Sequence, residues 1–214
     1  MIILLRTKKN DKETEENRLE HINRPVPSTF IKILITFLLI SKGQASLSVE
    51  PEEIVKKIFH LAKDKELKSS KKQQLKIEQM FNFKVMSEDI LGKNSTKQSP
   101  KEVDWFHQTI KGIITKTIYP KAPSFLNEVK IEYKNIEKSN YRATVYSIVK
   151  SKGEETEVNY NLKLINNHWK VVNVIIDDES WVENISEKVE TVIKKKKWKG
   201  LKKLLTKKLK ELKK

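Results

Sequence analysis

The chain has 214 residues, 37% of them hydrophobic, and a formal net charge of +16. This length suits one domain with a substantial core, and the absence of cysteine excludes disulfides and thiolate metal sites. Residues 194–214 contain twelve Lys and one Glu, a net +11 that leaves only +5 for the rest of the chain. The basic character therefore belongs to a C-terminal tail and not to the fold.

An almost wholly apolar run at residues 30–40 is the first feature along the chain. It is too short to span a bilayer, which needs about 20 residues, and it fits the hydrophobic region of a secretory signal. Small residues, Gly43 and Ala45, occupy the −3 and −1 positions of a cleavage site after Ala45. We expect residues 1–45 to be a leader and signal peptide. A buried core helix and an uncleaved inner-membrane anchor are the alternatives.

From residue 51 the hydrophobic periodicity is helical. Pro51 followed by two acidic residues is typical of a helix N-terminus, because Pro fits the first turn and carboxylates meet the helix dipole. A polar break follows at 68–72, and then a second helix that runs from about Lys72 into Met80 and ends near residues 81–83. A third, short helix is predicted to begin with Ser87 as its N-cap and to end near Leu91.

The strongest helix start lies at residues 99–102, after a predicted loop at 93–99. Its sequence, Ser-Pro-Lys-Glu, supplies an N-cap Ser, a Pro at the first helical position and a Glu two residues further on. This helix presents one face that is apolar except for its last member: Val103, Phe106, Ile110, Ile113 and Thr117.

After Tyr119 the period changes from 3.6 residues to 2, which is typical of strands. Apolar and polar residues alternate over 129–133, 143–149 and 158–164, and a fourth strand is predicted at 168–176. Links of hairpin length predict one antiparallel sheet of about four strands. Helices before and after this sheet give an α+β order.

Turn-forming residues, Lys152-Gly153-Glu154 and Asn166-Asn167, separate the last three of these strands. The fourth strand is apolar on both faces, so we expect it to be covered on both. Strict alternation would place Trp169, Val171 and Ile175 on one face and Val172, Val174 and Ile176 on the other.

Candidate catalytic and metal-binding groups are scattered. His60, His107 and His168 lack metal-ligand spacing, and neither a Gly-x-Ser-x-Gly elbow nor a Gly-rich phosphate loop is present in the sequence. The acidic cluster at 177–179 suits a metal site or a helix N-terminus. The second is favoured, because carboxylates there cap free amides and meet the dipole. We expect no enzyme activity, no metal and no cofactor.

The lysine-rich tail carries a stripe of leucines at helical spacing. Such a helix suits packing on the parent domain, attachment to an anionic membrane, or contact with nucleic acid, and an export signal argues against nucleic acid. We expect residues 199–214 to form a basic amphipathic helix that follows an α+β domain at 46–198. The charge favours a membrane or partner surface, where each Lys contributes about 1 kcal/mol before screening. The stripe comprises Leu201, Leu204, Leu205, Leu209 and Leu212.

Three blocks in the chain resemble one family in the expected order. They are residues 78–92, with a Phe-Asn-Phe followed by Met and Leu-Gly, residues 99–119, and a C-terminal block. The chain resembles the periplasmic phospholipid-binding component of the Mla (maintenance of lipid asymmetry) transport system, also called the toluene-tolerance auxiliary family. Within the C-terminal block the matching positions are Trp169, Lys170, Val174, Ser180, Val182, Asn184, Gly200 and Leu201, and the departures are Asn173, Asp178, Ile185 and Ser186.

The resemblance implies a fold like the cone of nuclear transport factor, with a curved sheet and helices across its concave face. It implies a soluble periplasmic carrier whose cargo is phospholipid, and which shuttles lipid between an inner-membrane ABC transporter complex and an outer-membrane lipoprotein complex. On this reading the acyl chains contact apolar residues of the sheet and of the helix that faces it. These are Val145, Val149, Tyr160, Leu162 and Leu164 from strands, and Phe106, Ile110 and Ile113 from the helix.

The same residues also suit an ordinary filled core. The alternative is therefore a secreted interaction domain with a packed core and a basic tail that binds anionic surfaces. An enzyme of the same fold is a third interpretation, disfavoured because the pocket faces lack polar residues.

Overall fold

The structure, a computed structural model, describes residues 49–212, which belong to one compact unit. The predicted signal peptide and its cleavage site after Ala45 lie outside the described residues. The helices in chain order are α3 (Pro51–Lys63), α4 (Lys71–Glu78), α5 (Phe83–Leu91), α6 (Pro100–Ile118), α7 (Ala122–Leu126) and α8 (Trp181–Glu211), with short 3-10 helices η1 (Lys65–Lys68) and η2 (Gly92–Lys97).

One antiparallel sheet has its strands in sequence order, and this confirms the predicted α+β class. The turns at 152–153 and 166–167 have positive φ, as two-residue hairpin turns require. A fifth, two-residue strand adds to the four that were predicted. The strands are β1 (Lys130–Lys138), β2 (Arg142–Ser151), β3 (Glu154–Ile165), β4 (His168–Ile176) and β5 (Glu179–Ser180).

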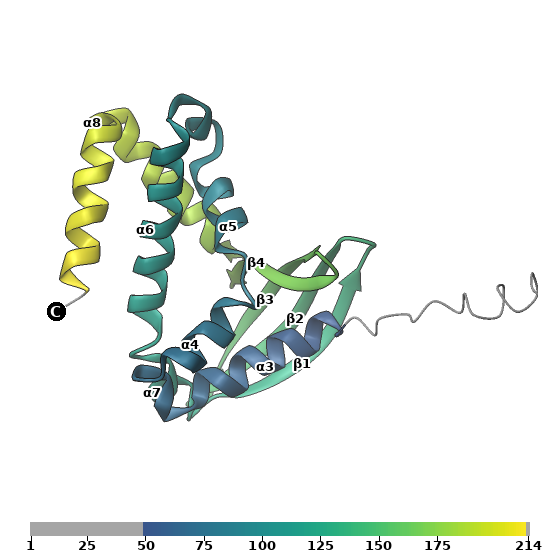
Figure 1. Ribbon diagram of the computed structural model, residues 1–214. Coiled ribbons are helices and arrows are strands. Elements are labelled where there is room, and N and C mark those ends of the chain that lie inside the picture. Colours follow the sequence, from purple (N-terminus) through teal and green to yellow (C-terminus); the bar gives the residue numbers. More distant parts are fainter. Residues whose placement is uncertain (1–48, 213–214) are drawn as a thin grey trace, which may run out of the picture. The chain divides into compact units, whose positions relative to one another are not determined.

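Helix α3 lies across one face of the sheet, while α5, α6 and α8 form a separate helical group beyond it (Figure 1). Three hydrophobic clusters follow from this arrangement. One joins α3 to the sheet, a second joins α5, α6 and α8, and a third lies around α4 and α7. Phe81 packs against all three, so the segment before α5 links the sheet layer to the helical group.

The segment 80–82 also covers one edge of the sheet. The Asn82 N–H donates to the Val171 carbonyl at 2.9 Å, and the Val171 N–H donates to the Met80 carbonyl at 2.9 Å. Strand β5 pairs with the other end of β4 through Ile175 and Ile176. The edge of β4 that faces away from β3 is therefore largely hydrogen-bonded, which opposes pairing with a strand of another molecule.

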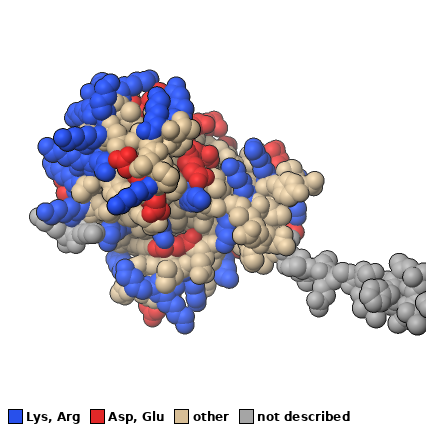
Figure 2. Space-filling model, turned by 45° about the horizontal axis from the view of Figure 1, so that its top comes forward, with Lys and Arg blue, Asp and Glu red and all other residues tan. Residues whose placement is uncertain are grey.

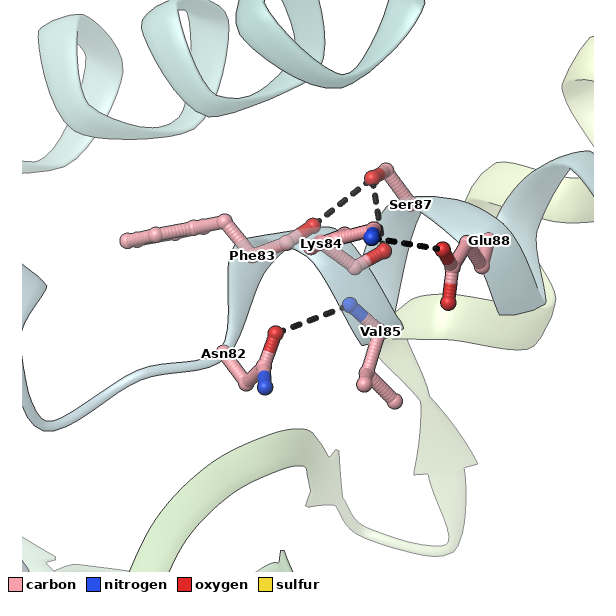
Figure 3. Close-up of polar contacts among 6 residues, drawn as sticks. All are labelled: Asn82, Phe83, Lys84, Val85, Ser87 and Glu88. Atoms are coloured by element: carbon pink, nitrogen blue, oxygen red, sulfur yellow. Dashed lines mark hydrogen bonds and ion pairs between the residues drawn. The ribbon is translucent and has the colours of Figure 1, made fainter. Parts of the chain in front are cut away.

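Helix α5 begins earlier than the sequence predicted. Its N-cap is Asn82, whose side-chain oxygen accepts from the Val85 N–H at 3.0 Å. Ser87 lies inside the helix, where its hydroxyl donates to the carbonyls of Phe83 and Lys84 (Figure 3). Ser87 is therefore not the cap, because its side chain is buried and bonded to the preceding turn. The predicted loop at 93–99 is largely the 3-10 helix η2.

A β-bulge changes the predicted faces of β4. Leu162 pairs with Val171 and Asn161 with Asn173, so Val172 is an extra residue without a partner of its own. Because side chains alternate across a strand, one inserted residue reverses the faces that follow it. Val174 and Ile176 therefore lie on the same face as Trp169 and Val171, against α3. The expectation that Ile175 would share this face was wrong.

Of the acidic residues before α8, Asp177 and Asp178 form a turn and Glu179 belongs to β5, so none of them is the helix cap that was favoured from sequence. Asp177 and Asp178 both have positive φ, and the Asp177 carboxylate accepts from the Glu157 N–H at 3.0 Å. The N-cap of α8 is Ser180, whose hydroxyl accepts from the Glu183 N–H at 3.2 Å.

Helix α8 bends sharply at Lys197, whose φ of 56° and ψ of −178° are not helical. We call residues 181–196 the first limb and residues 198–211 the second limb. A Cβ on Gly200 would lie 2.3 Å from the Cβ of Lys196, so only glycine lets the two limbs approach this closely. At the bend, the Trp198 indole donates to the Glu102 carboxylate of α6 at 2.8 Å and packs edge-on against Trp105.

The second limb packs against the rest of the protein. Leu201 is 1% exposed and Leu205 is 7% exposed, and both belong to the cluster with α5 and α6. Leu209 lies so close to Gly112 of α6 that a Cβ there would be 3.1 Å from its Cδ1. Leu201, Leu205 and Leu209 of the leucine stripe therefore pack on the domain, which was one of the alternatives left open by the sequence, while Leu204 stays exposed.

Candidate functional site

The residues predicted to contact acyl chains fall into two groups in the structure. Those from strands lie on the sheet face that α3 covers, which we call the inner face. Those from α6 lie in the cluster with α5 and α8. The helix that faces the sheet is α3 and not α6. The expectation that the α6 residues would face the strand residues across one pocket was therefore wrong. On the inner face are Val145, Val149, Tyr160, Leu162 and Leu164, and in the helical group are Phe106, Ile110 and Ile113.

The inner face is a continuous apolar surface made by neighbouring strands. Val145 pairs with Tyr160 across β2 and β3, and Leu162 pairs with Val171 across β3 and β4. Cross-strand pairs of this kind place their side chains in contact on one face. Val145 and Val171 are fully buried.

Helix α3 closes the inner face from above. Val55 is fully buried against the sheet, and the rings of Phe59 and Tyr160 meet edge-on with centroids 6.0 Å apart. Sequence reasoning gave α3 an apolar face but did not assign it to the site. The run of apolar residues at helical spacing was the available signal, although it does not say which surface the helix covers.

A few polar groups interrupt this surface without forming a catalytic set. The buried Ser147 hydroxyl donates to the Val158 carbonyl at 2.6 Å. Burial raises the pKa of the Tyr160 hydroxyl, and burial likewise raises the pKa of Tyr133 to about 12. Both phenols therefore stay neutral near pH 7 and supply no base. Among residues 49–212, no cluster of His, Asp and Glu could hold a metal ion.

A groove of about 210 Å³ lies between α6 and the two limbs of α8. Its wall is apolar except for two lysines, and it includes two of the residues predicted from α6. Pockets for drug-sized ligands usually occupy about 300–1,000 Å³, so this groove alone is too small for a two-tailed lipid. Its lining comprises Ile110, Ile113, Ile114, Ile185, Lys188, Val189, Val192, Leu201, Leu204, Leu205 and Lys208.

A larger cavity of about 500 Å³ lies between the strands and the start of α8, and sequence reasoning missed it. Its wall is mixed, with Arg142, Lys163, Asp89 and Glu183 among apolar and amide side chains. Charges of both signs make it poorly suited to an acyl chain, because buried charges need partners. No pattern in the sequence brings the lining residues together, since they come from α5, four strands and α8.

Asn173 stabilises the corner beside this cavity. Its side-chain amide donates to the Ser180 hydroxyl at 2.9 Å, and its side-chain oxygen accepts from the Val182 N–H at 3.2 Å. The amide therefore helps to satisfy the free N–H groups at the start of α8. This contact is made at a position where the resemblance leads one to expect Asp.

The fold and its apolar layers define a class of protein that buries a large hydrophobic surface under helices and assembles no catalytic group on it. The sequence model of the MlaC protein family matches residues 52–210, and the chain belongs to this family. The resemblance seen in the sequence is thus confirmed, and membership of a carrier family agrees with the prediction that the chain is not an enzyme.

The solved structures include a phospholipid-binding protein from Ralstonia solanacearum in complex with a phospholipid, with a TM-score of 0.64. It is 19% identical to this chain, and the similarity covers 76% of this chain and 96% of that one, which supports the fold. None of the curated proteins matches. Within residues 49–212, no helix is long and apolar enough to cross a membrane.

Proposed function

We propose that this protein is a periplasmic phospholipid carrier that holds acyl chains at the inner face of its sheet. It would move lipid between an inner-membrane ABC transporter complex and an outer-membrane lipoprotein complex, and so contribute to the lipid asymmetry of the outer membrane. The observation that carries the proposal is the continuous apolar inner face in a chain of the MlaC family.

The physical task of such a carrier is to hide acyl chains from water. Each buried methylene contributes about 0.8 kcal/mol, so a chain of about 16 carbons costs roughly 12 kcal/mol to expose. The inner face supplies apolar contacts from every one of the four long strands, for example Ile131, Val145, Leu162 and Val171. A head group that stays outside needs no dedicated pocket, which suits a carrier of several lipid classes.

Loading of lipid would require α3 and its neighbours to separate from the sheet, because the inner face is closely covered. The groove between α6 and α8 is small, but it belongs to the helical group that Phe81 connects to the inner face. Lipid that enters between the layers would replace the contacts of α3 with the sheet by contacts with acyl chains. The apolar surface of the sheet would therefore be buried both with lipid, by acyl chains, and without it, by α3.

The alternative function is a secreted interaction domain with a filled core. It draws support from Val55, Val145 and Val171, which the surrounding protein side chains bury completely. The two functions differ in one respect, which is whether phospholipid travels with the folded protein.

Native mass spectrometry of the protein after export tests the proposal. We expect a mass that corresponds to a chain beginning near Ser46, with one or more phospholipids bound, and lipid that is released when the protein is denatured. Folded protein that is always free of lipid would support the filled-core alternative. A chain recovered uncleaved from the cytosol would exclude the periplasmic location.

A further inference from the structure

The second limb of α8 has a basic face that the fold leaves uncovered. Leu201 and Leu205 point into the core. On the opposite side, spacings of four, four and three residues bring four lysines within about 80° of one another around the helix axis. These exposed residues, which we call the lysine face, are Lys199, Lys203, Lys207 and Lys210.

The lysine face carries almost no compensating charge. Among the described residues, Lys199, Lys203 and Lys210 have no acidic partner within ion-pair distance, and Lys207 has one only at 3.9 Å, in Glu211. Lys195, Lys196 and Lys197 are also exposed and extend the positive surface around the bend. Figure 2 shows the result, with Lys and Arg side chains gathered on one side of the molecule, over the bend and second limb of α8.

The orientation of this face is fixed by the packing beneath it. Because the leucines are held in the core and Trp198 is bonded to Glu102, the limb cannot rotate to hide its lysines. The lysines therefore project as one surface of a folded protein and not as a mobile tail. The positive charge is therefore always presented on the same side of the folded protein.

Two features favour a lipid bilayer over an acidic protein as the partner of the lysine face. Its charges are all Lys, which attract a diffuse negative surface as point charges, whereas recognition of individual carboxylates usually employs the planar fork of Arg. Beside it lies Leu204, 45% exposed, at the rim of the apolar groove between α6 and α8. A basic surface with an apolar residue at its margin is typical of helices that lie on membranes.

We propose that the lysine face docks the protein on the surface of an anionic phospholipid bilayer. The contact is electrostatic and reversible, and the exposed Leu204 lies at its margin. This goes beyond carriage of lipid, because docking depends on charge outside the apolar layers. Each lysine near an anionic surface should raise affinity by about fivefold.

Flotation with vesicles of the compact unit, which spans residues 47–214, tests this. The variant replaces Lys199, Lys203, Lys207 and Lys210 by Gln, a residue with good helix propensity. On vesicles of phosphatidylcholine with about one third phosphatidylglycerol, in about 0.1 M salt, we expect its affinity to fall at least about 30-fold. Binding by the parent should also weaken strongly at about 1 M salt, where the Debye length is about 3 Å.

A matched control separates the position of the charges from their number. Lys65, Lys68, Lys72 and Lys76, in η1 and α4, are exposed and have no ion pair among the described residues. Replacing them by Gln lowers the net charge equally and should reduce affinity less than about threefold. Equal losses in both variants, tight binding by the lysine-face variant, or equal binding to pure phosphatidylcholine would each overturn the proposal.

The same samples keep docking distinct from carriage. The substituted lysines lie outside the inner face, so the lysine-face variant should retain any phospholipid that co-purifies with the parent. Its circular dichroism and urea midpoint should match those of the parent, because exposed Lys to Gln changes remove no buried contact. A parent that fails to float on the anionic vesicles contradicts the proposal whether or not it carries lipid.

Discussion

Substitution of Leu201 by Ala should destabilise the protein strongly, because this leucine anchors the second limb of α8 in the core. Leu201 is 1% exposed and packs among residues of α5, α6 and the first limb. Removing its side chain loses the transfer free energy of the deleted carbons and leaves a cavity, together about 2–5 kcal/mol. Leu204 is in the same limb but 45% exposed, so Leu204→Ala should cost about 1 kcal/mol or less.

Urea unfolding, followed by far-UV circular dichroism and tryptophan fluorescence, measures both variants. The midpoint should fall for Leu201→Ala with little change in the m-value, since the surface exposed on unfolding is nearly the same. If the two variants lose equal stability, or if Leu201→Ala loses less than about 0.5 kcal/mol, the second limb does not pack as described. In that case removal of residues 199–212 should leave the stability unchanged. The structure instead predicts a loss of stability, because the removal would expose the hydrophobic cluster of α5, α6 and α8.

Three further predictions concern particular contacts. Gly200→Ala should cost about 1–3 kcal/mol in urea unfolding, because its Cβ would collide with Lys196 at the bend; Gly112→Ala, which meets only the tip of Leu209, should cost less. Asn82→Ala should cost about 1 kcal/mol as a lost N-cap, and an equal loss in Ser87→Ala would contradict the assigned start of α5. Desolvation raises the pKa of Glu102, but the hydrogen bonds from Trp198 and Lys202 lower it by more than this rise. The pKa of Glu102 in the folded protein therefore lies below its usual value of 4.5. The ionised carboxylate therefore stabilises the fold fully above pH 4.5, and this stabilisation is lost as the pH falls through the lower pKa of the folded protein. The urea midpoint of Glu102→Gln should therefore drop less between pH 7 and about pH 4 than the midpoint of the parent.

Local periodicity was sufficient for most elements of the fold. The alternation of Ala143, Val145, Ser147 and Val149 predicts β2 and its buried face correctly, because a strand in an antiparallel sheet has one face in the core. The cap at Ser99 was likewise evident, since Ser and Pro have fixed positional roles at a helix start. These signals act within a few residues and need no knowledge of tertiary structure.

The errors arose where tertiary contacts decide. Nothing in the sequence of β4 marks Val172 as the bulged residue, because the bulge depends on how Asn161 and Leu162 pair with it. The hydrophobic face of α6 was recognised, but periodicity cannot say that this face meets α5 and α8 while α3 covers the sheet. The leucine stripe of the second limb suited both packing and membrane contact, and only the burial of Leu201 and Leu205 separates the two.

The central claim, that acyl chains occupy the inner face, is tested most directly by adding volume on one side of a single strand. Val145 is fully buried on the inner face, and the next residue, Tyr146, points to the opposite face of β2. Val145→Trp should reduce the phospholipid that co-purifies, as counted by native mass spectrometry, at a stability cost of about 1–3 kcal/mol from overpacking. Tyr146→Trp should keep the full load. A folded Val145→Trp protein that carries as much lipid as the parent would contradict the account.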